Sequence, residues 1–257
     1  MKITPADSRN IRLVQITDTH VDAADGENFE GMDSTAALER VIARINALAP
    51  APDAVLATGD LAHHAGEAVY NKLLQRLSSF KAPVFCLPGN HDDPVLMRKI
   101  LNRGAVSTKK ILNMGPWKIV LLNTWMPDNH SGRLPEEELA FLQQAIMGRE
   151  DKNILVCMHH PPVKTGSPWM DAMMLENPEP LFNILDGGGH VRGIVWGHIH
   201  QEFRQLRGET LLLGTPSTCV QFKPNTREFT KDVLPPAFRT LTLTPEGAIE
   251  SHIVWVQ

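Results

Sequence analysis

Residues 84–92 of this chain run Val-Phe-Cys-Leu-Pro-Gly-Asn-His-Asp. The apolar residues at the start predict a short buried strand, and Pro88-Gly89 predicts the turn that ends it. An amide, an imidazole and a carboxylate follow directly, at Asn90, His91 and Asp92. Turns favour Gly, Asn and Asp in any protein, so this stretch gains its weight because the same arrangement recurs elsewhere in the chain.

Four more apolar runs, each typical of a buried strand, end in residues that commonly bind metals. Where strands alternate with helices, right-handed crossovers place the strands side by side in a parallel sheet. Binding sites in such sheets form at the carboxyl ends of the strands, which is where all five groups stand. The runs at 14–17, 54–58, 154–158 and 193–196 lead into Asp18-Thr19-His20, Gly59-Asp60, His159-His160-Pro161 and Gly197-His198-Ile199-His200.

Helical periodicity separates the first three of these strands. Asp33 is expected to cap an amphipathic helix whose apolar residues run from Leu38 to Leu48, ending before Pro50. Apolar residues over 69–77 predict a second helix. Further helices are predicted over 93–103, from Pro135 onward and over 181–185, with a long ordered loop at 161–178 and a flexible break at 187–189.

The C-terminal third changes in character and predicts strands separated by turns. Apolar runs at 211–213, 240–243 and 253–256 are expected to pair in an antiparallel manner, and another strand is expected at 117–123. We therefore predict an α/β fold with two packed sheets, formed by a single domain that spans residues 1–257.

The composition is typical of one sizeable soluble domain, since 42% of the 257 residues are hydrophobic and 21% are charged. The net charge of -4 offers no basic surface for nucleic acid or for an anionic membrane. Three cysteines without Cys-x-x-Cys spacing predict reduced thiols and a cytoplasmic location. Residues 1–12 lack the apolar stretch of a signal peptide, and no run approaches the roughly 18 apolar residues of a membrane span.

Seven side chains in the five groups are candidate metal ligands. Two cations about 3.5–4 Å apart need one ligand that touches both, and a carboxylate can do so with its two oxygens. Asp60 follows its strand as a lone acidic residue, so it is the predicted bridge. Nitrogen and oxygen donors without thiolates suit Zn, Mn, Fe, Co or Ni and differ from the all-oxygen cages of Ca and Mg. The candidates are Asp18, His20, Asp60, Asn90, His159, His198 and His200.

A metal pair of this kind predicts phosphoryl chemistry. It activates water near neutral pH and holds phosphoryl oxygens for in-line attack on phosphorus. The Asn90 amide donates less charge than a carboxylate, which leaves its metal a stronger Lewis acid. His91 is then free to protonate a leaving oxygen or to stabilise developing charge.

Each group also has an ordinary structural interpretation. Asp18 and Asp60 could cap helices, the commonest task of an aspartate between a strand and a helix. Asn90 could hold a turn with positive φ, and His159 and His160 could be core histidines bonded to the backbone. Their joint occurrence at strand ends favours a metal site, because so many buried polar groups would otherwise lack partners.

The five groups, in this order, resemble the motif set of the calcineurin-like metallophosphoesterase superfamily over residues 18–200. The resemblance implies a two-sheet ββ sandwich flanked by helices, the αββα fold. It implies that Asp60 bridges the metals, that Asp60 and His91 are catalytic, and that His160 supports the ligands without binding a metal. It assigns Asp18, His20, Asp60 and His200 to one metal and Asp60, Asn90, His159 and His198 to the other.

A narrower resemblance rests on residues 215–224, Thr-Pro-Ser-Thr-Cys-Val-Gln-Phe-Lys-Pro, together with 15–20 and 239–241. These stretches are similar to the bacterial class III 3',5'-cyclic AMP phosphodiesterases. That similarity implies hydrolysis of cAMP to 5'-AMP with two divalent transition-metal ions, iron or manganese first, with zinc and cobalt as alternatives. Its partner would be a small cyclic nucleotide, with no nucleic acid and no membrane. The implied substrate contacts are His20, Asp60, Asn90, His91 and His200.

Other functions stay open at this point. A broader phosphodiesterase or phosphatase would act on glycerophosphodiesters or phosphomonoesters with the same metal site. The loops at 161–178 and 214–238 are expected to decide between these substrates. An inactive scaffold of the same fold is disfavoured because every candidate ligand is present, and nucleic-acid processing is disfavoured by the acidic balance.

Several residues have two interpretations that the sequence leaves open. For His63 and His64 we favour a solvated turn over the rim of the metal site. Trp169, the pair Met173-Met174 and Phe222 are equally consistent with stacking on a base and with packing a loop against the domain. The remaining histidines, expected on the surface, are His130, His190 and His252.

Overall fold

The computed structural model describes residues 9–24, 26, 28–147, 152–188 and 190–257. The expected absence of a signal peptide concerns in part residues 1–8, which lie outside the described residues. The same holds for Gly189 in the expected flexible break. Among the described residues, no helix is both long enough and apolar enough to cross a bilayer.

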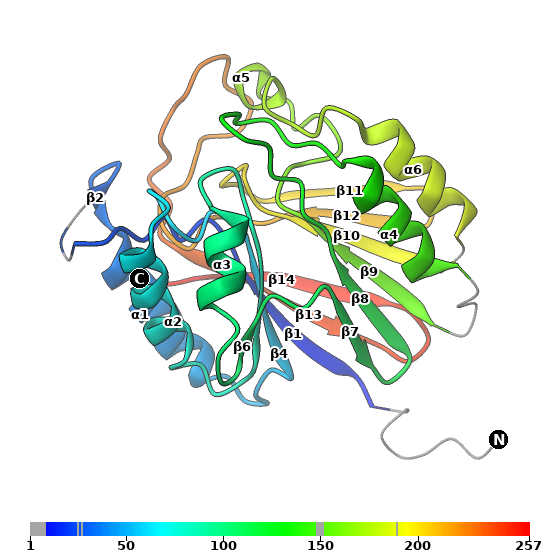
Figure 1. Ribbon diagram of the computed structural model, residues 1–257, viewed down its shortest axis with the longest axis horizontal. Helices are drawn as coiled ribbons and strands as arrows, with labels where there is room; N and C mark the ends of the chain where they lie inside the picture. The colour runs from blue at the N-terminus through cyan, green and yellow to red at the C-terminus, as the bar shows by residue number, and fades with distance from the viewer. Residues whose placement is uncertain (1–8, 25, 27, 148–151, 189) are drawn as a thin grey trace.

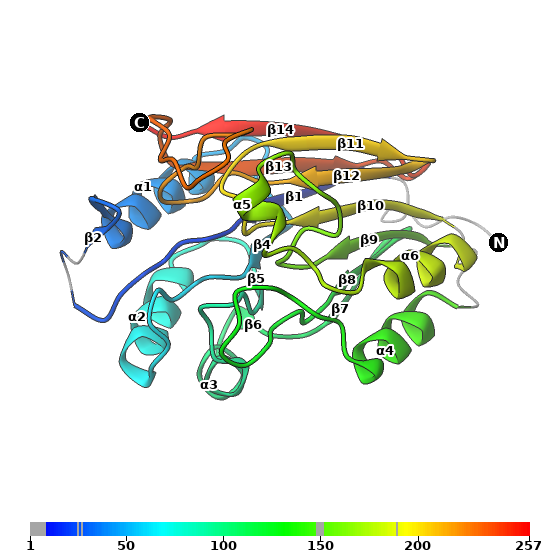
Figure 2. The same cartoon turned by 90° about the horizontal axis from the view of Figure 1, so that it is seen from above.

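Within these residues, two six-stranded mixed sheets pack against each other (Figures 1 and 2). The first sheet contains, in spatial order, β14 (Ile249–Trp255), β13 (Ala237–Leu243), β1 (Ile11–Ile16), β4 (Ala54–Thr58), β5 (Val84–Leu87) and β6 (Val106–Ser107). The second contains β11 (Phe203–Arg207), β12 (Thr210–Gly214), β10 (Val191–Trp196), β9 (Asn153–Cys157), β8 (Trp117–Leu121) and β7 (Ile111–Met114). A small hairpin, β2 (Asn28–Phe29) and β3 (Met32–Asp33), stands apart.

Helices cover the outer face of each sheet. Figure 1 shows α1, α2 and α3 along one side of the sandwich and α4 and α6 along the other. The predicted two-sheet sandwich flanked by helices is therefore confirmed. The helices are α1 (Ser34–Asn46), α2 (Glu67–Leu77), α3 (Pro94–Ile100), α4 (Glu136–Ile146), α5 (Pro168–Asp171) and α6 (Pro178–Gly187).

The apolar core forms three layers, which explains why the central strands are almost continuously hydrophobic. Leu13, Leu56 and Trp117 belong to the layer between the two sheets. The outer layers join the first sheet to α1, α2 and α3 and the second sheet to α4 and α6. Strands that are buried on both faces lose the alternation of polar and apolar residues, and β4 and β8 are buried at every position.

Parallel pairing brings the five sequence groups to one edge of the sandwich. In the first sheet β1, β4 and β5 run parallel to one another, and in the second β8, β9, β10 and β12 do so. The carboxyl ends of the strands in each sheet therefore point the same way, as predicted. The expectation that residues 1–257 form one domain stays a prediction.

Several boundaries and one pairing differ from the sequence prediction. Asp33 caps α1 as expected, with its Oδ1 accepting from the Ala36 amide at 2.9 Å. The helix predicted over 93–103 ends at Ile100, the strand predicted over 117–123 ends at Leu121, and the helix predicted over 181–185 extends over Pro178–Gly187. The loop predicted over 161–178 includes the short helix α5.

The antiparallel pairing predicted for the C-terminal strands is found between β13 and β14 and between β12 and β11, but β12 does not pair with β13 or β14. β12 pairs in parallel with β10 and lies in the second sheet, because the chain crosses between sheets after Gly214. The strands β2, β3, β6, β7 and β11 were not predicted from the sequence. β11 is polar and mostly exposed, so it lacks the apolar run that identifies a buried strand.

A buried arginine links the two sheets. Arg239 on β13 donates from Nε to the Thr215 hydroxyl at 2.8 Å and from Nη2 to the Gly214 carbonyl at 2.7 Å. It also donates to the Ser251 hydroxyl on β14. Thr215 in turn donates to the Gln15 side chain on β1 at 2.6 Å. Burial lowers the pKa of Arg239 to about 10, which leaves it charged at neutral pH.

Replacing this arginine should destabilise the fold. In Arg239→Met the Gly214 carbonyl and two hydroxyls lose a buried donor, and an unsatisfied buried polar group costs about 1–3 kcal/mol. We expect the free energy of unfolding in urea to fall by about 2–4 kcal/mol. Arg227→Met, at an exposed position, should stay within about 0.5 kcal/mol of the wild type. Equal midpoints for the two variants would contradict this account.

Candidate metal centre

The seven predicted ligands converge where the two sheets meet. Asp18 and His20 follow β1, Asp60 follows β4, and Asn90 follows β5. His159 follows β9, and His198 and His200 follow β10. All of these side chains are buried except that of Asn90, which is partly exposed. The structure therefore brings together every residue that the sequence selected.

One group of donors comprises Asp18, His20 and His200. The Nε2 atom of His200 lies 3.2 Å from Asp18 Oδ1 and 3.2 Å from Nε2 of His20. The other ring nitrogen of His200, Nδ1, donates to the Val220 carbonyl at 2.6 Å. A carbonyl can only accept, so Nδ1 carries a proton and Nε2 is the ring nitrogen that faces Asp18 and His20. Two such nitrogens beside a carboxylate oxygen form a site that suits a cation.

A second group comprises Asn90, His159 and His198. The amide oxygen of Asn90 lies 3.2 Å from His159 Nε2 and 3.0 Å from His198 Nδ1. His159 Nδ1 donates to the Thr58 carbonyl at 2.8 Å, so Nε2 is the ring nitrogen directed at this group. Among the described residues, His20 Nδ1 and His198 Nε2 are buried without a hydrogen-bond partner. The histidines are thus held by packing and backbone contacts, with their other nitrogens directed at the two groups.

Asp60 lies between the two groups and faces both. Its Oδ1 is 3.4 Å from His159 Nε2, and its Oδ2 is 3.9 Å from His20 Nε2. Oδ1 also accepts from the His91 amide at 2.9 Å. The helix after Asp60, α2, begins at Glu67 and follows Gly66, which offers no side-chain cap. The helix-cap interpretation of Asp60 is therefore wrong, and its geometry is that of a bridging ligand.

Asp18 does not cap a helix either. Its Oδ2 accepts from the His198 amide at 2.9 Å and from the Thr17 hydroxyl at 2.7 Å. The helix that follows Asp18 in the chain, α1, is capped by Asp33. The carboxylate of Asp18 is thus fixed by a neighbouring strand end, and its Oδ1 faces His200.

The backbone is strained at most of the candidate ligands. The φ angles of Asp18, His20, Asp60, His198 and His200 are 52°, 45°, 50°, 67° and 48°. A residue other than glycine in this left-handed region costs of order 1–3 kcal/mol, and such residues cluster at functional sites. Asn90 is not among the described residues with positive φ. Its alternative interpretation, as a turn residue with positive φ, is therefore wrong.

Two glycines allow the strand ends to approach this closely. A Cβ atom on Gly89 would collide with the carboxylate oxygen and the amide nitrogen of Asp60. A Cβ on Gly197 would collide with the Thr17 hydroxyl and would lie 2.6 Å from Asp18 Oδ2. Gly89 is thus required by the close approach of Asp60, and Gly197 by the close approach of Thr17 and Asp18.

The electrostatics favour the protonation states that bind metals. Burial raises the pKa of Asp60, but the nearby His159, His91 and His20 imidazoles together outweigh burial and the pKa falls well below its usual value. Burial lowers the pKa of His198 to about 3 and that of His20 well below its usual value. The carboxylate is therefore ionised, and these two imidazoles are neutral with lone pairs available.

His159 differs from the other histidines. Burial lowers its pKa, but the charge of Asp60 at 3.4 Å and that of Asp18 raise it more, and the pKa reaches about 9. This imidazole therefore carries a proton at neutral pH until a cation replaces that proton.

The second histidine of the adjacent pair, His160, has a polar partner near each ring nitrogen. Its Nδ1 lies 2.7 Å from the Thr124 hydroxyl and its Nε2 lies 3.2 Å from the His130 carbonyl. Its ring packs against that of His198, with 4.8 Å between centroids. This geometry agrees with the supporting role predicted for His160.

Asp92 and His63 lie beside the candidate ligands, and their positions were not predicted from the sequence. Buried Asp92 accepts from the Leu61 and Ala62 amides at 3.1 Å and from the Gly89 amide at 3.0 Å. It thereby ties the loop after β4 to the loop after β5. His63, expected in a solvated turn, is half-buried beside His20, so that expectation is wrong.

The other histidines lie on the surface as expected, with one qualification. His64 is exposed and pairs with Asp22 at 2.9 Å, and His190 and His252 are also exposed. His130 is exposed too, but it lines the cleft over the ligands, with its Nδ1 3.4 Å from the Asn90 amide nitrogen.

A cleft of about 150 Å³ opens over the two donor groups. Phe222 stacks on His200 with 3.9 Å between ring centroids. Trp169 packs edge-on against Phe222 and donates to the Thr226 hydroxyl at 3.3 Å. Both aromatic residues thus pack a loop and also line the cleft. Its apolar wall is formed by Phe29, Trp169, Met170, Met173 and Phe222.

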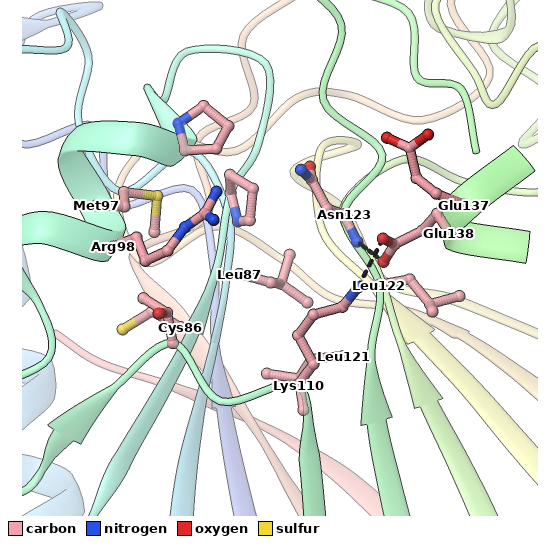
Figure 3. Close-up of a pocket in the computed structure, with 13 residues that line it drawn as sticks. Cys86, Leu87, Met97, Arg98, Lys110, Leu121, Leu122, Asn123, Glu137 and Glu138 are labelled. Carbon is pink, nitrogen blue, oxygen red and sulfur yellow. Dashed lines mark hydrogen bonds and ion pairs between the residues drawn. The ribbon is translucent and has the colours of Figure 1, made fainter. Parts of the chain in front are cut away.

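Two other hollows lie on the same side of the molecule. One of about 1120 Å³ shares Asn90 and His130 with the cleft and extends past Trp125. Another of about 370 Å³ lies beside α3 and the start of α4 (Figure 3) and contains the ion pair between Lys110 and Glu138, at 2.6 Å. None of the seven candidate ligands lines this last hollow.

Comparison with known proteins agrees with this geometry. A family model described as calcineurin-like phosphoesterase matches residues 11–202. The chain is 38% identical over 250 residues to the 3',5'-cyclic adenosine monophosphate phosphodiesterase CpdA of Pseudomonas aeruginosa, covering 97% of this chain and 92% of the relative. It is 36% identical over 243 residues to a 3',5'-cyclic-nucleotide phosphodiesterase of Nostoc sp., covering 95% and 91%.

A solved structure shares the fold. The crystal structure of a dimetal phosphatase from Danio rerio matches with a TM-score of 0.66 and 14% sequence identity, covering 96% of this chain and 99% of that one. At this identity the likeness shows the two-sheet architecture alone.

The Asn90 amide should be needed for one metal and not for the fold. Asn90→Ala removes the oxygen that faces both His159 and His198, so the protein should retain about one metal per chain instead of two. Elemental analysis after dialysis measures this directly. Asn129→Ala, whose side chain accepts from the Ser131 amide, serves as the matched control. Two metals in Asn90→Ala would show that the ligand assignment is wrong.

Metal binding should release a proton from His159. Because its pKa is about 9 in the metal-free protein, affinity for the metal in this group should rise about tenfold per pH unit between roughly pH 6.5 and 8. Titration calorimetry in buffers of different ionisation enthalpy would measure about one proton released per chain. An affinity that does not change with pH would contradict this assignment.

Proposed function

The chain belongs to the calcineurin-like phosphoesterase family, and on this premise we propose that it is a metal-dependent phosphodiesterase that hydrolyses 3',5'-cAMP to 5'-AMP. The observation that carries the proposal is the position of Asp60, whose two oxygens face two separate groups of histidine ligands. The named activity of relatives that match nearly the whole chain supports the choice of substrate.

We propose that two divalent transition-metal ions bind at this site, with Asp60 shared between them. Asp18, His20 and His200 would complete the first set of ligands, and Asn90, His159 and His198 the second. Nitrogen and oxygen donors without thiolates suit iron and manganese, with zinc and cobalt as alternatives. When bound, such a pair activates water and stabilises charge on phosphoryl oxygens.

The residues of the chain would orient the phosphodiester and receive its leaving oxygen. Asn90, His91 and His200 line the polar side of the cleft, where the phosphate group would lie. The backbone amide of His91 donates to Asp60, and the His91 side chain donates from Nδ1 to the His63 carbonyl at 2.9 Å. Its Nε2 is thus the ring atom left to stabilise or protonate the departing 3' oxygen.

The segment that resembles cyclic AMP phosphodiesterases supports the metal site from behind. The Ser217 hydroxyl donates to the Asp18 carbonyl at 2.7 Å, and the Thr218 amide donates to the Thr17 carbonyl at 2.9 Å. The Val220 carbonyl accepts from His200. This segment therefore fixes two ligand strands, and its Phe222 enters the wall of the cleft.

A second candidate substrate is a glycerophosphodiester or another diester with a longer arm. The hollow of about 1120 Å³ that shares Asn90 and His130 with the cleft offers space for such an arm. The metal site itself does not discriminate between the two substrates.

We also propose a cytoplasmic location and a small-molecule substrate. Cys86, Cys157 and Cys219 are all buried and unpaired, as is usual in a reducing compartment. The net charge of -4 disfavours nucleic acid and anionic membranes as partners.

Hydrolysis of cAMP by manganese-reconstituted protein tests the proposed function. We expect 5'-AMP as product, turnover of bis(p-nitrophenyl) phosphate alongside, and a loss of at least about 1,000-fold for both in Asp60→Ala, because the shared ligand is removed. Asp186→Ala, which loses only an exposed ion pair with Arg207, should match the wild type. Turnover of a glycerophosphodiester and the artificial diester without cAMP would contradict the proposed substrate.

A further inference from the structure

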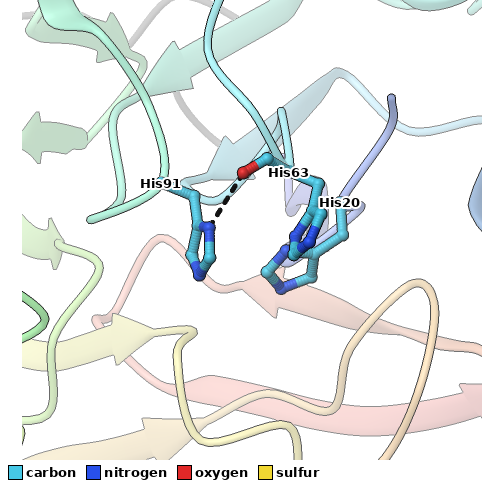
Figure 4. Close-up of side chains that lie close together, drawn as sticks. All are labelled: His20, His63 and His91. Carbon is cyan, nitrogen blue, oxygen red and sulfur yellow. Dashed lines mark hydrogen bonds between the residues drawn. The ribbon is translucent and has the colours of Figure 1, made fainter. Parts of the chain in front are cut away.

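His63 lies where the metal centre meets the loop after β4, and neither the metal ligands nor the proposed phosphate contacts include it. The rings of His20, His63 and His91 come together here (Figure 4), with one ring nitrogen from each within 4.8 Å of the others. His63 is half-buried, whereas the adjacent His64 is exposed.

The His63 ring is surrounded by aromatic neighbours. Its centroid lies 4.8 Å from that of Phe29, 5.6 Å from that of His20 and 4.3 Å from that of His64. Its backbone amide donates to the Val21 carbonyl at 2.9 Å. These contacts fix both the main chain and the ring of His63 before any substrate binds.

His63 contacts His91 in two ways. Its carbonyl oxygen accepts from His91 Nδ1 at 2.9 Å (Figure 4). Its ring also stacks on the His91 ring, with centroids 5.1 Å apart and planes inclined by 24°. The ring contacts that His91 makes with His20 and His130 are steeper, at 85° and 47°. Among the described residues, His63 is therefore the histidine whose ring lies most nearly parallel to that of His91 and covers one of its faces.

We propose that His63 is a positioning residue for His91. The carbonyl of His63 orients the His91 ring by accepting from Nδ1–H, because a carbonyl can only accept. The ring of His63 blocks rotation of the His91 ring away from the cleft. Together the two contacts hold His91 Nε2 toward the leaving oxygen. The inference rests on the proposed function in requiring a leaving oxygen that His91 assists.

The choice of substrate separates positioning from a general structural effect. The 3' oxygen of cAMP is a poor leaving group that needs a proton or charge stabilisation as it departs. The p-nitrophenolate anion is stable and needs little such assistance. A misplaced His91 should therefore slow cAMP hydrolysis much more than hydrolysis of bis(p-nitrophenyl) phosphate.

The test compares His63→Ala, His63→Phe and the control His252→Ala on both substrates with manganese-loaded protein. We expect kcat for cAMP to fall about 10- to 100-fold in His63→Ala, with at least tenfold less loss on the artificial diester and two metals retained. His63→Phe keeps a flat ring on His91 and should recover most of the loss. His252→Ala, at an exposed histidine of β14, should match the wild type.

A double variant measures the dependence on His91. If His63 acts through His91, adding His63→Ala to His91→Ala should cause no further loss on cAMP. Fully additive losses would overturn the proposal, as would equal losses on both substrates, loss of a metal in His63→Ala or failure of His63→Phe to recover activity.

Ring spectra keep this test independent of the substrate. In zinc-loaded protein, nitrogen–proton correlation spectra should show a sharp Nδ1–H signal of the His91 ring in the wild type and in His63→Phe. The signal should broaden in His63→Ala, because without the stacked ring the His91 ring can turn away from the retained backbone carbonyl. An unchanged ring signal in His63→Ala would overturn the positioning role. If the wild type cleaves only the artificial diester, the proposed function fails and these spectra still decide the role of His63.

Discussion

The carboxylate of Asp60 is the constraint on which the rest of the site depends. Its two oxygens face two donor groups, each of which draws side chains from both sheets, and its position requires a glycine at the facing strand end. Two parallel sheet cores must therefore meet with their carboxyl ends at one edge and in one register. The inter-sheet contacts of Arg239, Thr215 and Gln15 lie behind this edge and fix that register. The architecture serves to bring the strand ends together.

The site is held in a conformation that the local sequence alone would not favour. Five of the seven candidate ligands have left-handed backbone angles, and buried carboxylates and imidazoles lie within a few ångströms of one another. The surrounding core, in three apolar layers, stabilises this arrangement. Bound cations would neutralise the carboxylates. They would coordinate Nε2 of His159 and of His200, because Nδ1 of each ring bonds a backbone carbonyl, that of Thr58 or Val220.

Much of the fold and nearly all of the candidate ligands could be predicted from the sequence, because each ligand directly follows an apolar run. The parallel order followed from the alternation of strands and helices. Edge strands such as β11 could not be predicted, since they are exposed and polar. The sheet to which β12 belongs could not be predicted either. It depends on where the chain crosses from one sheet to the other, and the local pattern of apolar residues does not show this. The roles of His63 and Asp92 also required the structure, because their partners lie about 28 to 31 positions away in the chain.

Anomalous diffraction from crystals grown with manganese tests the central claim most directly. The account predicts two metal peaks on either side of the Asp60 carboxylate, about 3.5–4 Å apart. One peak should lie beside Asp18, His20 and His200, and the other beside Asn90, His159 and His198. A single peak, or a pair of peaks that Asp60 does not bridge, would contradict the account.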